Sequence, residues 1–178
     1  FNGNKIVTTG GGGIIITNNK KLGKKIKHLT TTAKISHKWE YIHDEIGFNF
    51  RMPNVNAALG VAQLEKIKIL LKAKKEIFSK YSRTLNKIEG IDIFKEPKSC
   101  KSNYWLQTLV LSKKNSKFKN LILKKLHKSK IYARPSWKLI SELKPYKNCK
   151  KMNLGGSREI YKRIINLPSS QGLILKRR

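Results

Sequence analysis

The chain has 178 residues, 39% of them hydrophobic, which suffices for one domain with a core or for about one and a half small domains. It carries 40 basic and 10 acidic residues, a net charge of +30, and no stretch is long and apolar enough to cross a membrane. The two cysteines, Cys100 and Cys149, have no CxxC partner and no histidine at zinc spacing, so we expect a reducing, cytoplasmic setting and no metal.

The charge by itself favours an anionic partner such as nucleic acid. The basic residues are nearly all lysine, however, and they are spread along the whole chain. Arginine would be expected to feature strongly in the readout of bases and phosphates. We therefore expect no nucleic-acid partner, and we keep a basic nucleic-acid-binding module only as an alternative interpretation of the charge.

The first seventeen residues combine one lysine, a glycine run and a β-branched run. The β-branched run, Ile14 to Thr17, predicts a buried strand. The glycines, residues 10–13, permit close approach of the backbone, but they match neither a P-loop nor a dinucleotide fingerprint. A lysine beside such a surface can be a general base or a Schiff-base amine, because burial lowers its pKa. Spacing alone favours a solvated Lys5 before a flexible turn.

Residues 20–29 predict a short basic helix with leucine and isoleucine on one face. Residues 33–53 have no helical or strand period, and they gather aromatic side chains, two histidines and three of the ten acids of the chain. Such irregular segments often build sites. The sequence His43-Asp44-Glu45 could equally serve only to hold a loop in place by hydrogen bonds.

Apolar residues then recur at three- and four-residue steps from Val55 to Ile88, which predicts one long amphipathic helix. Asn54 is its expected N-cap, and Gly90 lies near its end. Small residues at 56–60 would allow close packing. The apolar stripe predicts a core face.

The remaining chain predicts a compact α/β unit with a small, largely antiparallel sheet. The expected strands are residues 91–94, 104–111 and 130–133. The expected helices are residues 117–129, with Leu121, Ile122 and Leu126 inward, and 158–165.

Two long motifs resemble the nucleotide-sugar aminotransferases of the DegT/DnrJ/EryC1/StrS family. Residues 1–13 (FNGNKIVTTGGGG) resemble the cofactor-lysine segment, and residues 43–65 (HDEIGFNFRMPNVNAALGVAQLE) resemble a second hallmark. Residues 30–41 (TTTAKISHKWEY) and 166–170 (NLPSS) are similar to one branch of the family. That branch aminates a 4-keto-6-deoxy nucleotide sugar on the way to legionaminic acid or bacillosamine.

The resemblance implies an α/β fold, the pyridoxal-phosphate-dependent transferase fold type I. Residues 1–52 would be the C-terminal end of the large, cofactor-binding domain, with the lysine loop. Residues 53–178 would be a long linking helix and the small C-terminal domain. We therefore expect Phe1 to be preceded by further chain, and this 178-residue piece alone to be inactive.

The resemblance also implies pyridoxal 5'-phosphate as cofactor, glutamate as amino donor and a homodimer. Lys5 would hold the cofactor covalently and then act as acid and base. Asn49 would reach across the dimer to the cofactor phosphate, and Arg51 would serve phosphates or anchor its loop. Arg134 and Trp137 would shape the nucleotide-sugar pocket. A non-catalytic relative that keeps the fold as a scaffold remains the other alternative.

Overall fold

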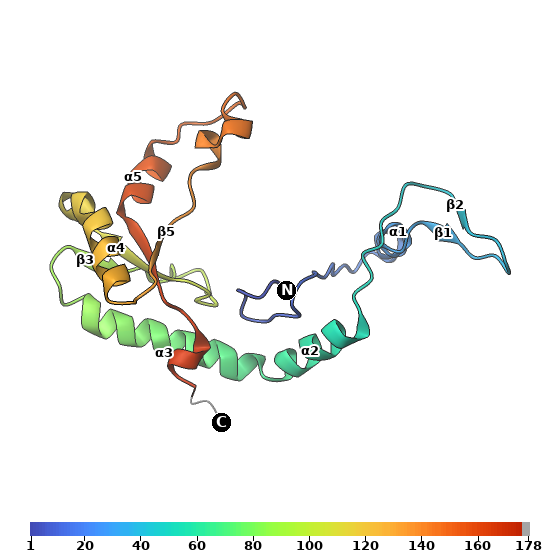
Figure 1. The fold of residues 1–178 in the computed structure, drawn as a ribbon, viewed down its shortest axis with the longest axis horizontal. Coiled ribbons are helices and arrows are strands. Elements are labelled where there is room, and N and C mark those ends of the chain that lie inside the picture. The colour runs from blue at the N-terminus through green and yellow to red at the C-terminus, as the bar shows by residue number, and fades with distance from the viewer. Residues whose placement is uncertain (176–178) are drawn as a thin grey trace. The chain divides into compact units, whose positions relative to one another are not determined.

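The computed structural model describes residues 1–175, and the chain forms two compact units (Figure 1). The first unit is Phe1–Ile67 and the second begins at Lys68. Among the described residues, no helix combines the length and apolar character that crossing a membrane requires. The expected division at residue 52, between a large and a small domain, stays a prediction about the whole protein.

The first unit contains two helices and a short hairpin. Helix α1 (Lys20–Thr30) begins where the Asn19 side chain accepts a hydrogen bond from the amide of Leu22 at 3.0 Å. Strands β1 (Lys34–Ile35) and β2 (Ile42–His43) pair antiparallel, and α2 spans Asn54–Glu65. The predicted helix over residues 20–29 is confirmed.

The predicted strand over Ile14–Thr17 is wrong. These residues form no strand, and Ile16 is 84% exposed. A β-branched run becomes a strand only when a neighbouring strand completes its backbone hydrogen bonds. None of the strands in the described part of the chain pairs with this run.

The predicted long helix is two helices. The first, α2, ends at Glu65. The amide of its C-cap residue, Lys66, donates to the carbonyl of Gln63 at 3.2 Å, and α3 (Ile67–Leu85) follows directly. The N-cap position of α2 belongs to Pro53, so that Asn54 is already helical. The apolar period runs on through both helices, and a period of this kind does not reveal a break of one residue.

The second unit is built on a four-stranded sheet whose strands all pair antiparallel, in the order β3-β4-β6-β5. The strands are β3 (Ile91–Ile93), β4 (Gln107–Leu111), β5 (Arg134–Pro135) and β6 (Ile164–Leu167). The predicted small antiparallel sheet is therefore confirmed. The core consists of alternate residues of these strands with one neighbouring alanine: Ile93, Leu109, Leu111, Ala133, Ile165 and Leu167.

Helices α3 and α4 (Lys119–Lys128) pack on this core. From α3 come Phe78, Tyr81 and Leu85, and from α4 come Ile122, Leu123 and Leu126. The prediction that Leu121 points inward is wrong, because this side chain is exposed. Within residues 1–175, short 3-10 helices cover Lys114–Phe118, Ile140–Glu142, Lys144–Tyr146 and Gln171–Leu173.

Two predicted elements have different bounds in the structure. The expected strand at residues 130–133 is displaced to β5, and the expected helix at 158–165 is α5 (Gly155–Arg163), followed directly by β6. The sequence analysis missed β6. Short apolar runs such as Ile164-Ile165 fit helix and strand equally, and the decision comes from pairing with β4.

Candidate functional site

Lys5 lies on a closed loop at the start of the first unit. Two backbone hydrogen bonds close the loop. The amide of Lys5 donates to the carbonyl of Asn2 at 3.0 Å, and the amide of Thr9 donates to the carbonyl of Phe1 at 3.1 Å. The hydroxyl of Thr8 donates to the same Phe1 carbonyl at 3.0 Å. Lys5 itself is exposed among the described residues.

Helix α2 holds this loop from one face. Gln63 Oε1 accepts a hydrogen bond from the amide of Thr8 at 2.9 Å, and Asn56 Nδ2 donates to the carbonyl of Thr9. Thr9 is 1% exposed and packs on Gly60, where an added Cβ would lie 2.9 Å from the Thr9 methyl group. The predicted close packing of the small residues in α2 is therefore confirmed at Gly60. Sequence reasoning missed the anchoring roles of Asn56 and Gln63.

The glycine run lines a cavity of about 960 Å³ within the first unit. Two of its glycines, Gly10 and Gly12, have φ of +84° and +83°, which explains why glycine stands there. Polar groups from α1, from the loop after β2 and from α2 also face the cavity: Lys27, Thr30, Arg51 and Asn56. Among the described residues, Lys5 is not one that lines it.

The loop that carries Asn49 is fixed to the end of α1. The amide of Phe48 bonds the carbonyl of Leu29 at 2.7 Å, and the amide of Phe50 bonds that of Thr30 at 2.9 Å. Asn49 and Arg51 are brought together, since Asn49 Oδ1 accepts from the Arg51 amide at 3.4 Å. With its oxygen facing Arg51, Asn49 retains an amide nitrogen that can donate to an anion.

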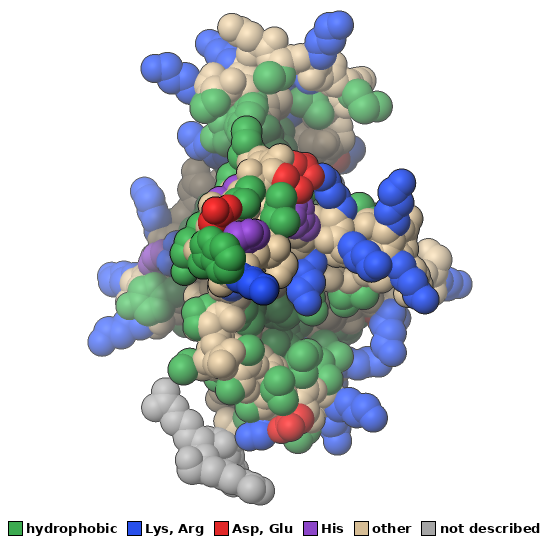
Figure 2. Space-filling model, turned by 90° about the vertical axis from the view of Figure 1, so that its right-hand side faces the viewer, with side chains coloured by type: hydrophobic (Ala, Val, Ile, Leu, Met, Phe, Trp, Pro, Cys, Tyr) green, Lys and Arg blue, Asp and Glu red, His purple; other side chains and the backbone are tan. Residues whose placement is uncertain are grey.

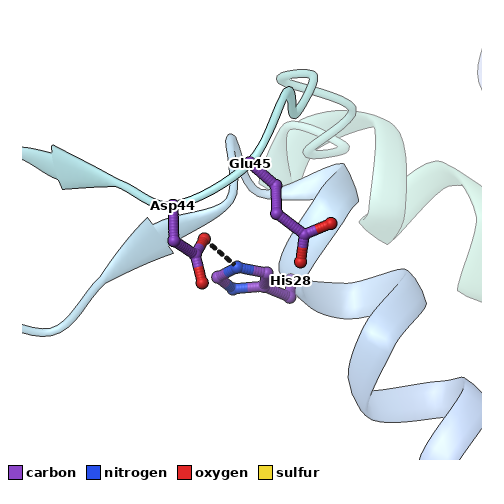
Figure 3. Close-up of side chains that lie close together, drawn as sticks. All are labelled: His28, Asp44 and Glu45. Atoms are coloured by element: carbon purple, nitrogen blue, oxygen red, sulfur yellow. Dashed lines mark hydrogen bonds and ion pairs between the residues drawn. The ribbon is translucent and has the colours of Figure 1, made fainter.

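Ion pairs tie the residues after β2 to α1. His28 Nε2 lies 2.6 Å from Asp44 Oδ1 (Figure 3). Lys25 pairs with Glu45. His43 Nδ1 lies 2.7 Å from the carbonyl of Thr32. The hydrogen-bonding alternative for His43, Asp44 and Glu45 is therefore the one that the structure supports.

The same cluster offers ligand atoms that a metal ion would need, since those of His28, Asp44 and Glu45 lie within 4.8 Å of one another. Each of these side chains is already engaged, and the ammonium of Lys25 would repel a cation at Glu45. We interpret the cluster as an anchor for the loop.

This anchor should depend on pH. The hydrogen bond from His28 holds the pKa of Asp44 below its usual value of 3.8. A lowered pKa in the folded state means that the bond stabilises the loop above the pKa of the unfolded chain, and that this is lost as pH falls through the folded value. We expect hydrogen exchange of amides 44–50, corrected for intrinsic rates, to accelerate below about pH 4.

Asp44→Asn should show fast exchange in this segment at every pH. Asp92→Asn, which changes an exposed carboxyl group of β3, should leave the segment unchanged. Protection that is equal in the native chain and in Asp44→Asn at neutral pH would rule out the anchoring role.

The second unit carries Arg134 and Trp137. Arg134 lies in β5 opposite Asn166, and Trp137 is 66% exposed. The ring of Trp105, which precedes β4, stacks on that of Trp137 with centroids 6.1 Å apart and an interplanar angle of 24°. Sequence reasoning missed Trp105.

Comparison with known proteins gives consistent results. The DegT/DnrJ/EryC1/StrS aminotransferase family model matches residues 1–177. GDP-perosamine synthase of Vibrio cholerae is 32% identical over 174 residues, which are 97% of this chain and 47% of that protein. UDP-4-amino-4,6-dideoxy-N-acetyl-beta-L-altrosamine transaminase of Campylobacter jejuni is 29% identical over 178 residues, 99% of this chain and 47% of that protein.

Among solved structures, Helicobacter pylori PseC, an aminotransferase involved in the biosynthesis of pseudoaminic acid, matches with a TM-score of 0.79 and 27% identity. The match covers 90% of this chain and 44% of PseC. The chain therefore spans less than half the length of each of these relatives.

Proposed function

Because the chain belongs to the DegT/DnrJ/EryC1/StrS aminotransferase family, we propose that the whole protein transfers an amino group to a keto group of a nucleotide sugar. The observation that carries this proposal is the family match over residues 1–177. The match to PseC confirms the expected fold class, the α/β fold of the pyridoxal-phosphate-dependent aminotransferases. We propose pyridoxal 5'-phosphate as the cofactor.

The residues of this chain fit that cofactor by their chemistry. Lys5 presents a primary amine, which reacts with an aldehyde, on a loop whose backbone is fixed at both ends. Asn49 and Arg51 offer neutral and charged N–H donors, which suit a phosphate. When bound, the cofactor supplies the electron sink that amino-group transfer requires.

Lys5 would have two roles in this reaction. Its amine would hold the cofactor covalently, and after release it would carry the proton between substrate carbon and cofactor. The bonds from Asn56 and Gln63 keep the loop of Lys5 in one place, which limits the amine to a small volume. Asn49 would donate to the cofactor phosphate, from the partner subunit of a homodimer.

We further propose a 4-keto-6-deoxy nucleotide sugar as acceptor and glutamate as donor, in the cytoplasm, for the synthesis of cell-surface glycans. The names of two relatives support the acceptor, because both are enzymes of amino-sugar nucleotides. They are perosamine and altrosamine enzymes, so we no longer favour the legionaminic acid or bacillosamine branch over these. Arg134 and Trp137 would contact the substrate.

The test is an assay of the whole protein with pyridoxal 5'-phosphate, glutamate and either a GDP- or a UDP-linked 4-keto-6-deoxyhexose. We expect 2-oxoglutarate to form together with the 4-amino sugar nucleotide, and mass spectrometry should detect both products. Lys21→Ala, which changes an exposed lysine of α1, should retain the activity.

An inactive whole protein would contradict the proposal. If that protein also bound DNA or RNA with a steep salt dependence, the basic binding module would be favoured. Lysine and arginine side chains are scattered over the face shown in Figure 2. A scattered distribution is typical of a solvated surface rather than of a binding track.

A further inference from the structure

Lys74 of α3 is a buried lysine that forms no ion pair with any described carboxylate. Its residue is 4% exposed. Its ammonium donates to the carbonyl of Trp105 at 3.3 Å, to the hydroxyl of Ser169 at 3.0 Å and to the carbonyl of Ser169. Burial lowers the pKa of this amine. A buried charge whose described partners are neutral oxygens is costly, so its position in the fold calls for a reason.

The bonds of Lys74 join three segments that are far apart in the sequence. They connect α3 with the residue that leads into β4 and with the residue that leaves β6. Ser169 closes the triangle, because its hydroxyl donates to the carbonyl of Trp105 at 2.8 Å. Two turns further along α3, the hydroxyl of Tyr81 donates to the carbonyl of Pro168 at 3.0 Å.

The backbone that Lys74 holds is the one that carries the Trp105 ring. That ring lies against Trp137, whose own ring is largely exposed. The Trp105 ring therefore packs beneath an exposed aromatic ring, and the position of the Trp105 backbone determines where its own ring lies. The NLPSS segment, residues 166–170, supplies the other half of the clamp.

We propose that Lys74 is a positioning residue that fixes the Trp105–Trp137 pair for contact with the nucleotide-sugar substrate. The proposal rests on the proposed function, in which Trp137 contacts that substrate. Lys74 acts through the carbonyls of Trp105 and Ser169, and it takes no part in the chemical step.

The chain offers a matched control in Lys119 of α4. It is also buried, at 8% exposed, and burial also lowers the pKa of its amine. Its ammonium donates to the backbone carbonyl of Tyr161 and lies 4.5 Å from the centroid of the Tyr161 ring. Lys119 thus reproduces the burial and the backbone bond of Lys74 without a bond to Trp105.

The experiment compares Lys74→Met, Lys74→Arg and Lys119→Met in the whole protein. We expect Lys74→Met to reduce the near-ultraviolet circular dichroism of the stacked tryptophans and to raise KM for the nucleotide sugar about tenfold. The change in kcat should stay within about twofold. Lys74→Arg should restore part of both signals, and Lys119→Met should change neither. Equal effects of Lys74→Met and Lys119→Met would overturn the proposal.

Trp137→Phe separates this proposal from the function on which it rests. If Trp137→Phe leaves KM unchanged while Lys74→Met still alters the dichroism, Lys74 positions the pair but Trp137 does not contact the substrate, and the proposal fails at that step. If no variant and no native protein transfers an amino group, the proposed function fails, and the dichroism still reports on the clamp.

Discussion

Lys5→Ala is expected to abolish covalent binding of pyridoxal 5'-phosphate and to lower the rate of amino transfer by about 10²- to 10⁴-fold, the usual contribution of a positioned acid–base group. In the proposed mechanism, the substitution removes both the amine that would hold the cofactor and the group that would move the proton. The measurement is the absorbance of the protein-bound imine in the whole protein. Borohydride reduction followed by peptide mass spectrometry should place the pyridoxyl group on residue 5.

The matched control is again Lys21→Ala, which should keep both the absorbance and the labelled peptide. Lys5 is exposed in the described chain, so folding should not depend on its side chain, and the circular dichroism of Lys5→Ala should match that of the native protein. An unchanged imine band in Lys5→Ala would falsify the central role of this amine.

Gly47→Ala is expected to destabilise the first unit by about 1–3 kcal/mol, because an added methyl group there would overlap backbone. Its Cβ would lie 2.4 Å from the carbonyl carbon of Thr32 and 2.5 Å from the amide nitrogen of Ala33. Backbone cannot swing aside as a side chain does, and Thr32 and Ala33 already have positive φ of 72° and 49°. Denaturant unfolding, monitored at Trp39 in the same unit, measures the change.

The loop displaced by Gly47→Ala carries Asn49, which we proposed as a donor to the cofactor phosphate, so in the whole protein affinity for pyridoxal 5'-phosphate should fall together with stability. Gly13→Ala is the control, since nothing lies within 4 Å of its added Cβ, and it should change stability by no more than about 0.5 kcal/mol. Similar losses in both variants would mean that the close approach at Gly47 is not what limits the residue there to glycine.

Local patterns in the sequence were sufficient for several elements. The apolar period of residues 20–29 predicts α1, and the alternation in residues 104–111 predicts β4, which the structure has at Gln107–Leu111. Lys5 and Asn49 were identified as candidates through a resemblance of long motifs, and their roles stay predictions. These are features for which neighbours in the sequence carry the information.

What the sequence could not supply depends on partners far along the chain. Ile14–Thr17 has the composition of a strand, but no described strand completes it, whereas Ile164–Leu167 becomes a strand because β4 lies beside it. The bond between His28 and Asp44 joins a helix to a loop, and no spacing rule relates these positions. Lys74 was missed for the same reason, since its bonds to Trp105 and Ser169 join residues that no sequence spacing relates.

The hold of α2 on the first loop has a consequence for engineering. Residues 56, 60 and 63 recur at helical intervals, so about two turns of helix more than fifty residues downstream hold the loop that carries Lys5. Libraries that aim to retune the amino-donor preference proposed for the whole protein should therefore diversify this part of α2 as well as the residues that line the cavity. Substitutions in it are expected to alter the reach of residue 5 while leaving its chemistry intact.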